Sequence, residues 1–253
     1  MVLPKYSIIT STYNSQQSLA TTIESILDQK GNNFEYIIID GKSTDKTVEI
    51  IKSFEKEFLK RTIKYIWISE KDSGIYEAFN KGLTLSKGEW VSFVGSDDVL
   101  KDSYLKEAEK FLEKNQPELL SFKGEVVKNG ISLKEVGDPW NWSVFKKEMK
   151  VVHIGAFHHQ NYFKKFGKFN ESYKIAGDYE MLLRARNELR TGFIDNVLVS
   201  IGDEGISKTQ IKRSLLEAKK AKTSTGSRSR LLAEKDFYWV FLKIKIKEIL
   251  GIA

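Results

Sequence analysis

The stretch from Asp72 to Asp98, DSGIYEAFNKGLTLSKGEWVSFVGSDD, ends in two adjacent carboxylates that directly follow a short apolar run. The run from Trp90 to Val94 is typical of a buried strand, and a Gly-Ser pair ends it. Asp97 and Asp98 are therefore expected at the carboxyl end of this strand, where open parallel sheets bind ligands. Their oxygens suit Mg²⁺ or Mn²⁺. The alternative is a plain turn in which Ser96 and the two acids cap the next helix.

Two further predicted strands, nearer the N-terminus, also end in polar residues. In FEYIIIDGKSTD, residues 34–45, a continuous apolar run is followed by Asp40, and Ser43 or Thr44 is expected to cap the next helix. The run from Tyr6 to Ile9 leads into TSTYN and then into a helix with apolar residues at helical spacing. We therefore expect three strand ends to converge on polar groups.

Strands and helices alternate along the first part of the chain, which is the pattern of a doubly wound α/β fold. The expected strands cover residues 6–9, 34–39, 63–68 and 90–94, and the helices between them end near residues 29, 58 and 86. A Lys-Asn-Gly turn within residues 119–136 predicts a hairpin that leaves the parallel sheet. Further helices are expected at 103–115 and 179–189, and a further strand at 193–201.

Four motifs in sequence, STYN, IDGKSTD, DSGIYEAFNKG and GSDD, resemble those of glycosyltransferase family 2. The resemblance extends from about Tyr6 to Ser207. It implies the GT-A fold, a doubly wound, mostly parallel sheet flanked by helices, with a small antiparallel extension. Residues 1–222 are then expected to form the catalytic domain, with a nucleotide-binding half at 1–100 and an acceptor-binding half at 101–222. Residues 223–253 form a basic, aromatic tail.

The resemblance also implies roles at the donor site of an inverting enzyme that uses a UDP-sugar and Mn²⁺ or Mg²⁺. Asp98 is the expected metal ligand. Asp40 would accept a hydrogen bond from the uracil imide N–H, and cytosine presents an acceptor at that position, so that uridine is favoured. The residues expected to bind nucleotide are Thr12, Tyr13, Asn14, Asp40, Ser96 and Asp97, and those expected at the sugar and diphosphate are Asp72, Asn80 and Lys81.

A further acidic residue, Asp178, lies in KIAGDYEMLLR at residues 174–184, at the start of a predicted helix. On its residue type alone, Asp178 is either a helix N-cap or a catalytic group. The resemblance implies that it is the base that deprotonates the acceptor hydroxyl. The resemblance also places His153 beside the acceptor pocket, whereas His158 and His159 are expected to be structural and not metal ligands.

Length, charge and cysteine content limit the class of protein to which the chain can belong. The chain has 253 residues, a net charge of +7 and no cysteine, so we expect one α/β domain with a sizeable core and no disulfides. No segment approaches the roughly 20 apolar residues of a membrane span and no secretion signal is evident, which favours a cytoplasmic protein. No nucleic-acid module is recognisable, and we expect no nucleic-acid partner.

Basic charge is concentrated towards the C-terminus, where the stretch from Lys208 to Arg230 is followed by FYWVFLKIKIKEILGIA. Apolar and aromatic side chains interleaved with lysines suit peripheral contact with an anionic bilayer. Alternatively, this tail packs against the domain or against a second copy in a homodimer, with its lysines in solvent. The composition of Thr223 to Arg230 indicates a mobile loop or a hinge into the tail.

The sequence therefore predicts a metal-dependent transferase that moves a single hexose or N-acetylhexosamine from a UDP-sugar to a saccharide or lipid-linked saccharide in cell-surface polysaccharide synthesis. Ser214 stands where processive synthases have a tryptophan, which favours one sugar per encounter. Near residues 205–207 the resemblance implies a loop that closes over the donor. The alternatives are a nucleotide-sugar-binding protein of the same fold without catalysis and a basic interaction module, and the complete acidic set argues against both.

Overall fold

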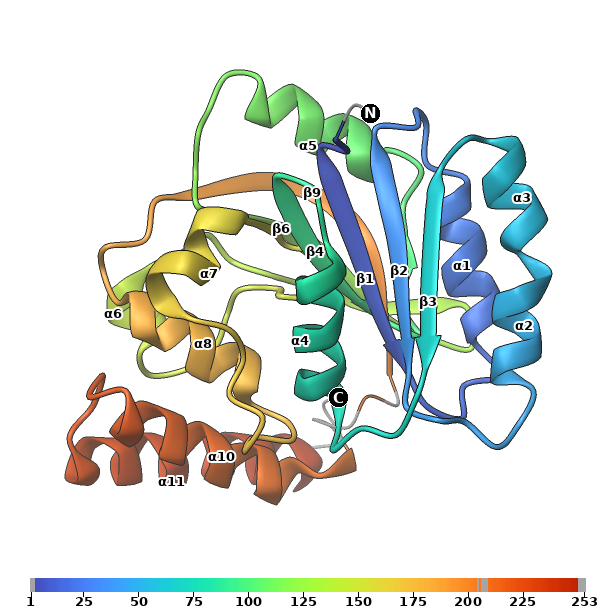
Figure 1. Cartoon of the computed structure of the whole chain (residues 1–253). Coiled ribbons are helices and arrows are strands. Elements are labelled where there is room, and N and C mark those ends of the chain that lie inside the picture. The colour runs from blue at the N-terminus through green and yellow to red at the C-terminus, as the bar shows by residue number, and fades with distance from the viewer. Residues whose placement is uncertain (1–2, 204, 206–208, 250–253) are drawn as a thin grey trace.

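The computed structural model describes residues 3–203, 205 and 209–249 (Figure 1). Within these residues nine strands form one sheet in the order β3-β2-β1-β4-β8-β6-β9-β5, with β7 paired to β6. The strands are β1 (Tyr6–Thr12), β2 (Phe34–Asp40), β3 (Lys64–Ser69), β4 (Trp90–Gly95), β5 (Val99–Leu100), β6 (Leu119–Lys128), β7 (Ile131–Val136), β8 (Phe157–His159) and β9 (Thr191–Gly202). The helices are α1 (Leu19–Leu27), α2 (Thr47–Ser53), α3 (Glu55–Lys60), α4 (Ile75–Leu85), α5 (Tyr104–Leu112), α6 (Trp142–Phe145), α7 (Gln160–Phe166), α8 (Gly177–Ala185), α10 (Ile211–Ser224) and α11 (Arg230–Ile249).

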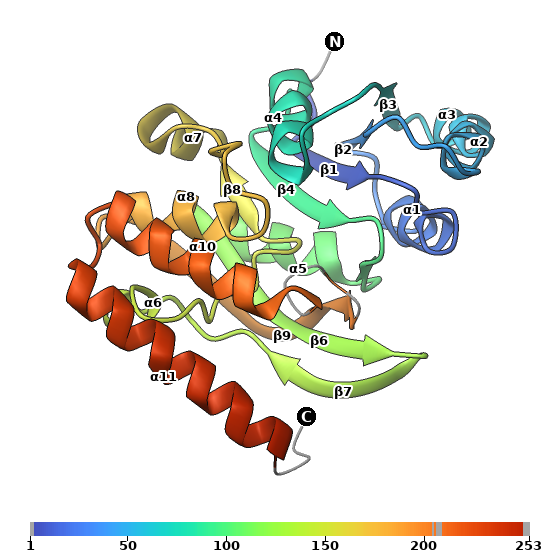
Figure 2. The ribbon, with the colours of Figure 1, turned by 90° about the horizontal axis from the view of Figure 1, so that it is seen from below.

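The first four strands in sequence form the parallel half of the sheet. They are continuous apolar runs because helices cover both faces, with α1, α2 and α3 on one side and α4 on the other (Figures 1 and 2). Neighbouring residues of one strand therefore enter different cores: Ile8 packs with Ile23 and Phe58, and Ile9 with Phe79 and Met181. The predicted doubly wound α/β fold is confirmed.

The register of these strands brings their carboxyl ends to one level. Thr12 at the end of β1 lies opposite Asp40 of β2, and Asp40 lies opposite Ser69 of β3. On the other side of β1, Ser11 lies opposite Gly95 at the end of β4. The polar ends that the sequence predicted separately therefore form one continuous row at the sheet edge.

Antiparallel strands occur in the second half of the sheet, as predicted. Strand β8 runs antiparallel to β4 and β6, and β5 runs antiparallel to β9. The expectation that the hairpin of residues 119–136 leaves the parallel sheet is wrong for β6, which pairs in parallel with β9 along most of its length. It holds for β7, which pairs with β6 alone. The long β6–β9 pairing also carries Gly202 towards the end of β4.

The C-terminal helices α10 and α11 lie side by side next to α8 (Figure 2). The buried ammonium of Lys222 on α10 lies 3.3 Å from the Asp236 carboxylate on α11 and donates to the Lys147 carbonyl. Lys243 of α11 also forms an ion pair with Glu148 (2.7 Å). The tail is therefore helical and packs on the domain, as one of the two sequence interpretations proposed. No helix within the described ranges has the length and apolarity to span a bilayer.

Several predicted boundaries are wrong. The composition of residues 223–230 indicated a loop or hinge, and residues 225–229 do connect α10 to α11, although α10 continues through Ser224 and α11 begins at Arg230. The helix expected at 179–189 ends at Ala185 because Arg186 adopts a left-handed conformation, with φ of 50°. Lys208, residues 206–207 of the expected closing loop, and residues 250–253 of the tail lie outside the described residues.

Helix α4 approaches β1 closely only because residue 82 has no side chain. A Cβ at Gly82 would lie 2.4 Å from Ile9 Cγ2. Alanine in a helix interior otherwise gains about 0.5–1 kcal/mol over glycine, whereas overpacking costs roughly 1–3 kcal/mol. We therefore expect Gly82→Ala to lower the free energy of unfolding, measured with urea. Thr84→Ala on the exposed side of α4 should change it by less than about 0.5 kcal/mol, and an unchanged or more stable Gly82→Ala protein would contradict this packing.

Candidate active site

Hydrogen bonds tie the loop after β1 to the loops after β2 and β4. The backbone N–H of Asn14 donates to Ser43 Oγ (2.8 Å), and Asn14 Oδ1 accepts from the Thr44 N–H (2.9 Å). Asn14 has φ of 50°, a conformation that asparagine tolerates better than most residues. Ser15 Oγ lies 2.8 Å from Ser96 Oγ in the third loop. These bonds fix the three strand ends relative to one another.

Thr12 and Tyr13, both predicted to bind nucleotide, directly precede this linked segment. Thr12 is buried, and its Oγ1 has no hydrogen-bond partner within the described part of the chain. The Tyr13 side chain is 63% exposed, so its ring presents a free face next to the row of strand ends. A buried hydroxyl and an exposed aromatic ring are both suited to a nucleoside.

Asp40 is fully buried at the end of β2 and is held by two serine hydroxyls. Ser43 Oγ donates to Oδ1 and Ser69 Oγ donates to Oδ2, each at 2.5 Å. The prediction that Ser43 or Thr44 caps the next helix is wrong, because α2 starts later, at Thr47. Ser43 instead orients the Asp40 carboxylate. The Ser43 N–H also donates to Oδ2 (3.0 Å). A carboxylate accepts about four hydrogen bonds, so Asp40 retains capacity for one more.

Asp72 lies beside the same strand end. A Cβ at Gly41 would lie 3.1 Å from Asp72 Oδ2, so the absent side chain makes room for this carboxylate next to Asp40. Asp72 Oδ1 accepts from the Gly74 N–H (2.9 Å). Burial raises the pKa of Asp72 above its usual value. Two carboxylates therefore border the end of β2.

Asp97 and Asp98 form a second carboxylate pair at the end of β4. A Cβ at Gly95 would lie 2.6 Å from Asp98 Oδ2 and 3.0 Å from Asp97 Oδ1, so the two carboxylates approach the same point. Asp98 is buried, and Oδ2 accepts from the Gly95 N–H (3.0 Å). Its backbone carbonyl accepts from Thr22 Oγ1 of α1 (2.8 Å). Asp97 is exposed and contacts the end of β9, where a Cβ at Gly202 would lie 2.8 Å from Oδ2.

This pair fits a divalent cation chemically. Burial and the neighbouring Asp97 raise the pKa of Asp98 to about 7, because the pocket supplies too little positive charge for two carboxylates. A cation would supply that charge through hard oxygen ligands. The described residues contain no cluster of three or more His, Cys, Asp or Glu side chains, so the remaining ligands would come from bound diphosphate and water. The alternative that these residues cap a helix is wrong, since strand β5 follows them.

Asp178 lies in the first turn of α8, one position after Gly177, and is not the N-cap, which is Ala176. The Tyr76 hydroxyl of α4 lies 2.6 Å from the Ile175 carbonyl and 3.2 Å from Asp178 Oδ1, so its single proton is shared between these two acceptors and is nearer to the carbonyl. Burial, together with the Asp178 charge, raises the pKa of Tyr76 well above its ordinary value, so the hydroxyl stays protonated. A Cβ at Gly177 would lie 2.6 Å from the Tyr76 ring, so glycine permits this contact.

Helix α10, in the C-terminal part of the chain, holds the segment that precedes Asp178. One oxygen of Glu217 on α10 accepts from the backbone N–H groups of Lys174 (2.9 Å), Ile175 (2.8 Å) and Ala176 (3.1 Å). These backbone bonds lower the pKa of Glu217 against the opposing effect of burial. Helix α10 therefore fixes the start of α8 and, with it, the position of Asp178.

Asn80 and Lys81 already have partners on the domain surface. The Asn80 carboxamide bonds the Phe169 backbone at both its N–H and its carbonyl (3.0 Å each). Lys81 forms ion pairs with Glu70 (3.0 Å) and Glu77 (2.9 Å). These contacts connect α4 to neighbouring segments and leave the predicted diphosphate role of the two residues untested.

Of the three histidines, His153 lies nearest to Asp178. The two residues line one cavity of about 440 Å³, which Ile201 of β9 also borders. His153 is buried, and burial lowers its pKa, so its ring is neutral and stacks on Phe93 (5.9 Å between centroids). His159 Nδ1 accepts from the Asn161 N–H at the start of α7, a structural role as predicted.

The structure brings part of the predicted set together, whereas Asn80, Lys81 and His153 have other contacts. The row Thr12, Asp40, Asp72 and the pair Asp97 and Asp98 share the strand-end edge, and Tyr76 connects α4 from this edge to Asp178. Sequence analysis missed the residues that hold the acids and the start of α8 in place, because most of them are distant in sequence from the group that they contact, and Ser43, three positions after Asp40, was interpreted as a helix cap. These residues are Ser43, Ser69, Thr22, Tyr76 and Glu217.

The chain is similar in sequence to known proteins. Residues 7–176 match the family described as Glycosyl transferase family 2. The chain is 27% identical over 232 residues to a PGL/p-HBAD biosynthesis glycosyltransferase of Mycobacterium tuberculosis, covering 90% of this chain and 89% of that one. It is 36% identical over 109 residues to the putative teichuronic acid biosynthesis glycosyltransferase TuaG of Bacillus subtilis, covering 43% of this chain and 42% of that one.

Two solved structures share the fold. A crystal structure of Staphylococcus aureus TarS in complex with UDP-GlcNAc has a TM-score of 0.72 at 20% identity, covering 92% of this chain and 70% of that one. The mannosyltransferase PcManGT from Pyrobaculum calidifontis, in complex with GDP-Man and Mn²⁺, has a TM-score of 0.68 at 16% identity, covering 94% and 70%. The predicted GT-A arrangement is therefore confirmed.

The raised pKa of Asp98 predicts a pH-dependent response to metal. Because the folded protein binds this proton more tightly than the unfolded chain, the contribution of Asp98 to stability falls as pH rises from about 4 to about 7. A bound cation replaces the proton. Mn²⁺ at about 100 times its Kd should therefore raise Tm by roughly 5–10 °C at about pH 8 and by less at about pH 5.5.

Variants at two acids test this response by thermal unfolding. Asp98→Asn should abolish the Tm increase with Mn²⁺ at both pH values, because the neutral amide removes the buried negative charge. Asp28→Asn, at an exposed position after α1, should respond as the natural protein does. An equal Mn²⁺ effect in the Asp98→Asn protein would show that the cation binds elsewhere.

Proposed function

The chain belongs to glycosyltransferase family 2, and we propose from this membership that it moves one hexose or N-acetylhexosamine from a UDP-sugar to an acceptor hydroxyl, with inversion. The observation that carries the proposal is the row of acids at the strand ends, Asp40 and Asp72 after β2 and Asp97 and Asp98 after β4. Asp178, held by Tyr76 of α4, supplies a further carboxylate on α8. Nucleotide then occupies the half formed by residues 1–100, and acceptor the half formed by residues 101–222. Residues 223–253 are assigned to a C-terminal tail that follows these two halves.

Asp40 is assigned to the uracil imide N–H, with its carboxylate oriented by Ser43 and Ser69. Orientation by two hydroxyls reduces the freedom that the carboxylate loses when nucleotide binds. The other nucleotide contacts are assigned to Thr12, Tyr13, Asn14, Ser96 and Asp97. TarS was solved in complex with UDP-GlcNAc and PcManGT, of the same fold, with GDP-Man, so the assignment of UDP rests on Asp40 and the uracil imide N–H.

Asp98, next to Asp97, is assigned to a Mn²⁺ or Mg²⁺ ion. Such an ion supplies Lewis-acid stabilisation of the charge on the departing diphosphate. Asp72 is assigned to the donor sugar, beside the end of β2. Asn80 and Lys81 border the diphosphate and act through their partners, Asn80 by holding the Phe169 backbone and Lys81 by pairing with acids of α4 and its preceding loop.

Asp178 removes the proton from the acceptor hydroxyl while the acceptor oxygen forms its bond to the anomeric carbon. The bond from that carbon to the phosphate oxygen breaks, and UDP leaves with the electron pair. Tyr76 positions Asp178 by donating a hydrogen bond to Oδ1. His153 lies on the same cavity and borders the acceptor or transferred sugar. A sugar hydroxyl is too weakly acidic to attack without such a base, whose contribution is about 10²–10⁴ in rate.

The second candidate function is a nucleotide-sugar-binding protein of the same fold without catalysis. The two are distinguished with a panel of UDP-sugars, by measuring UDP release without acceptor. The transferase should release UDP slowly from at least one of them, and only with Mn²⁺ or Mg²⁺. A protein that binds UDP with metal and releases none from any donor has the second function.

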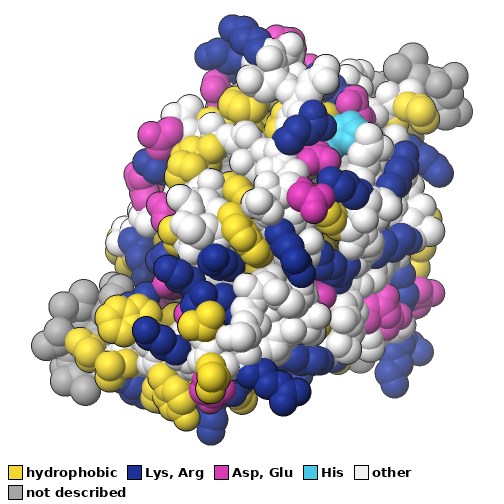
Figure 3. All heavy atoms as spheres, turned by 90° about the vertical axis from the view of Figure 1, so that its left-hand side faces the viewer, with side chains coloured by type: hydrophobic (Ala, Val, Ile, Leu, Met, Phe, Trp, Pro, Cys, Tyr) yellow, Lys and Arg dark blue, Asp and Glu magenta, His cyan; other side chains and the backbone are white. Residues whose placement is uncertain are grey.

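The acceptor is assigned as a saccharide or lipid-linked saccharide in cell-surface polysaccharide synthesis, used from the cytoplasmic side of the membrane. One face of α11 supports peripheral membrane contact. Tyr238, Trp239, Leu242 and Ile246 on this face are 61%, 62%, 52% and 46% exposed. Hydrophobic and basic side chains gather along the lower edge of the molecule in Figure 3. This composition suits an anionic bilayer surface.

The base assignment predicts the behaviour of Asp178→Asn. This variant should keep its UDP affinity, because the amide does not alter the strand-end row, and should lose about 10²–10⁴ in transfer rate. Glu188→Gln, at an exposed position after α8, should be as active as the natural protein. Transfer by Asp178→Asn at nearly the natural rate would refute the assignment. Calorimetry gives the UDP affinity, and product formation gives the rate.

The membrane assignment predicts that the protein sediments with vesicles of phosphatidylglycerol and phosphatidylcholine, and not with phosphatidylcholine alone. The double variant Trp239→Ser, Leu242→Ser should bind at least about tenfold more weakly, because two exposed apolar anchors are lost. Leu59→Ser, 76% exposed on α3, is the control and should bind normally. Dimerisation that the double variant abolishes, without any vesicle binding, would assign this face to a homodimer instead.

A further inference from the structure

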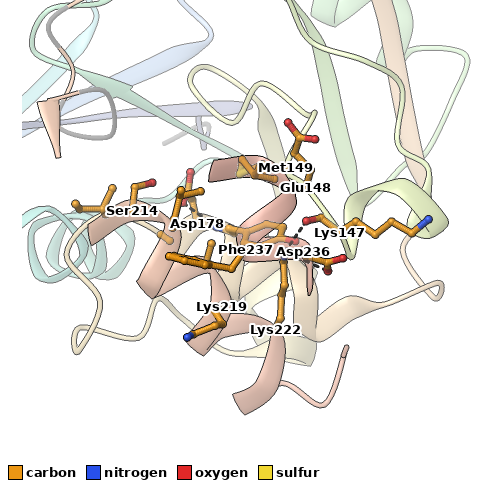
Figure 4. A pocket seen from close by; sticks show the side chains of 15 residues that line it. Lys147, Glu148, Met149, Asp178, Ser214, Lys219, Lys222, Asp236 and Phe237 are labelled. Carbon is orange, nitrogen blue, oxygen red and sulfur yellow. Dashed lines mark hydrogen bonds and ion pairs between the residues drawn. The ribbon is translucent and has the colours of Figure 1, made fainter. Parts of the chain in front are cut away.

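Asp178 lies in the wall between two cavities. The cavity of about 440 Å³ that contains His153 lies on one side, and a cavity of about 340 Å³ lies on the other, where α8 meets α10 and α11 (Figure 4). Both are lined by Met149 and Asp178. A base that serves this transfer must reach the acceptor hydroxyl, whose oxygen must in turn reach the anomeric carbon, so the acceptor and the donor sugar meet close to the base. The two cavities on either side of Asp178 provide one space for each of the two sugars.

The larger cavity is connected to the donor half. Ile201 on its wall directly precedes Gly202, and a Cβ at Gly202 would lie 2.8 Å from the Asp97 carboxylate. Its remaining lining is partly charged, including Asp138 and Lys150, and suits the hydroxyl groups of a sugar. The transferred sugar therefore occupies this cavity, which leaves the smaller one for the acceptor.

The smaller cavity is lined mainly by apolar side chains from the C-terminal helices and their neighbours. Leu215 and Ala218 come from α10, and Phe237 and Val240 from α11. Met149, Ile175, Ala176 and Tyr179 also contribute to this lining. In Figure 4, Asp178 and Ser214 lie towards one end of the cavity, so the apolar surface starts beside the proposed base.

Most charged groups around this cavity form ion pairs. Lys222 pairs with Asp236 (3.3 Å), Lys219 with Glu234 (2.9 Å), and Glu148 with Lys243 (2.7 Å). These pairs neutralise much of the positive charge that would attract a phosphate or carboxylate. The lining therefore favours an apolar group over an anion.

We propose that the smaller cavity binds an apolar aglycone attached next to the accepting hydroxyl, so that the acceptor is an alkyl or aryl glycoside rather than a free or phosphorylated sugar. This inference rests on the proposed function, because it takes Asp178 as the base. The tail helices are then a wall of the acceptor site. The volume is within the range of pockets that hold small apolar groups, about 300–1,000 Å³.

The test compares the binding of octyl and methyl β-D-glucopyranoside, below the micelle concentration of the octyl compound, by calorimetry. The natural protein should bind the octyl glycoside at least about tenfold more tightly, because the alkyl chain is removed from water. Ala218→Phe, which fills the cavity, should lose this preference. Leu216→Phe, at an exposed position of the same helix, should retain it. If Ala218→Phe fails to fold, as judged by circular dichroism, Val240→Trp replaces it.

The outcomes separate this inference from the proposed function. Equal binding of the two glycosides, or an octyl preference that persists in the cavity-filling variant through the exposed face of α11, overturns the apolar subsite. Metal-dependent UDP release by the same preparation then leaves the proposed function intact. Failure to release UDP from any UDP-sugar overturns the proposed function, and with it the role of the cavity as an acceptor site.

Discussion

The in-register parallel pairing of β1 with β2 and β4 is the constraint on which the site depends. Parallel strands place their carboxyl ends at one edge, and the register sets Thr12 opposite Asp40 and Ser11 opposite Gly95. A shift of one residue would bring side chains of other shapes into both close-packed cores and break the hydrogen bonds between the loops after β1 and β2, so packing and these bonds favour this register. The acids therefore reach the same edge because the cores require that alignment.

Holding carboxylates at such an edge requires hydrogen bonds from distant segments, because a buried acceptor without partners costs about 1–3 kcal/mol, and more if charged. Asp40 obtains these bonds from Ser43 and Ser69. The start of α8 obtains them from Glu217 and Tyr76. Asp98 keeps a raised pKa because its hydrogen bonds do not offset burial beside a second acid. This imbalance distinguishes Asp98 as a position where positive charge is needed.

Local sequence patterns predicted the parallel half well, since continuous apolar runs such as Tyr36 to Ile39 can be read without tertiary information. These patterns failed where contacts between distant segments determine the strand pairing or the role of a side chain. The strand β6 pairs with β9 across about 70 residues of sequence, and no local signal reports that pairing. Ser43 was interpreted as a helix cap because a serine hydroxyl can cap a helix as readily as it can bond a neighbouring carboxylate. Tyr76 is 102 positions from Asp178, so only the fold reveals their contact. The tail was ambiguous because its packing depends on the buried Lys222.

The central claim is that the strand ends and α8 form a single site around a divalent cation and a nucleoside diphosphate. A crystal structure with UDP and Mn²⁺, with manganese located by its anomalous scattering, tests this most directly. The account predicts one manganese peak within roughly 2.0–2.5 Å of an Asp98 carboxylate oxygen, with uracil at Asp40 and diphosphate between them. Manganese bound away from Asp98, or uracil away from Asp40, would contradict it.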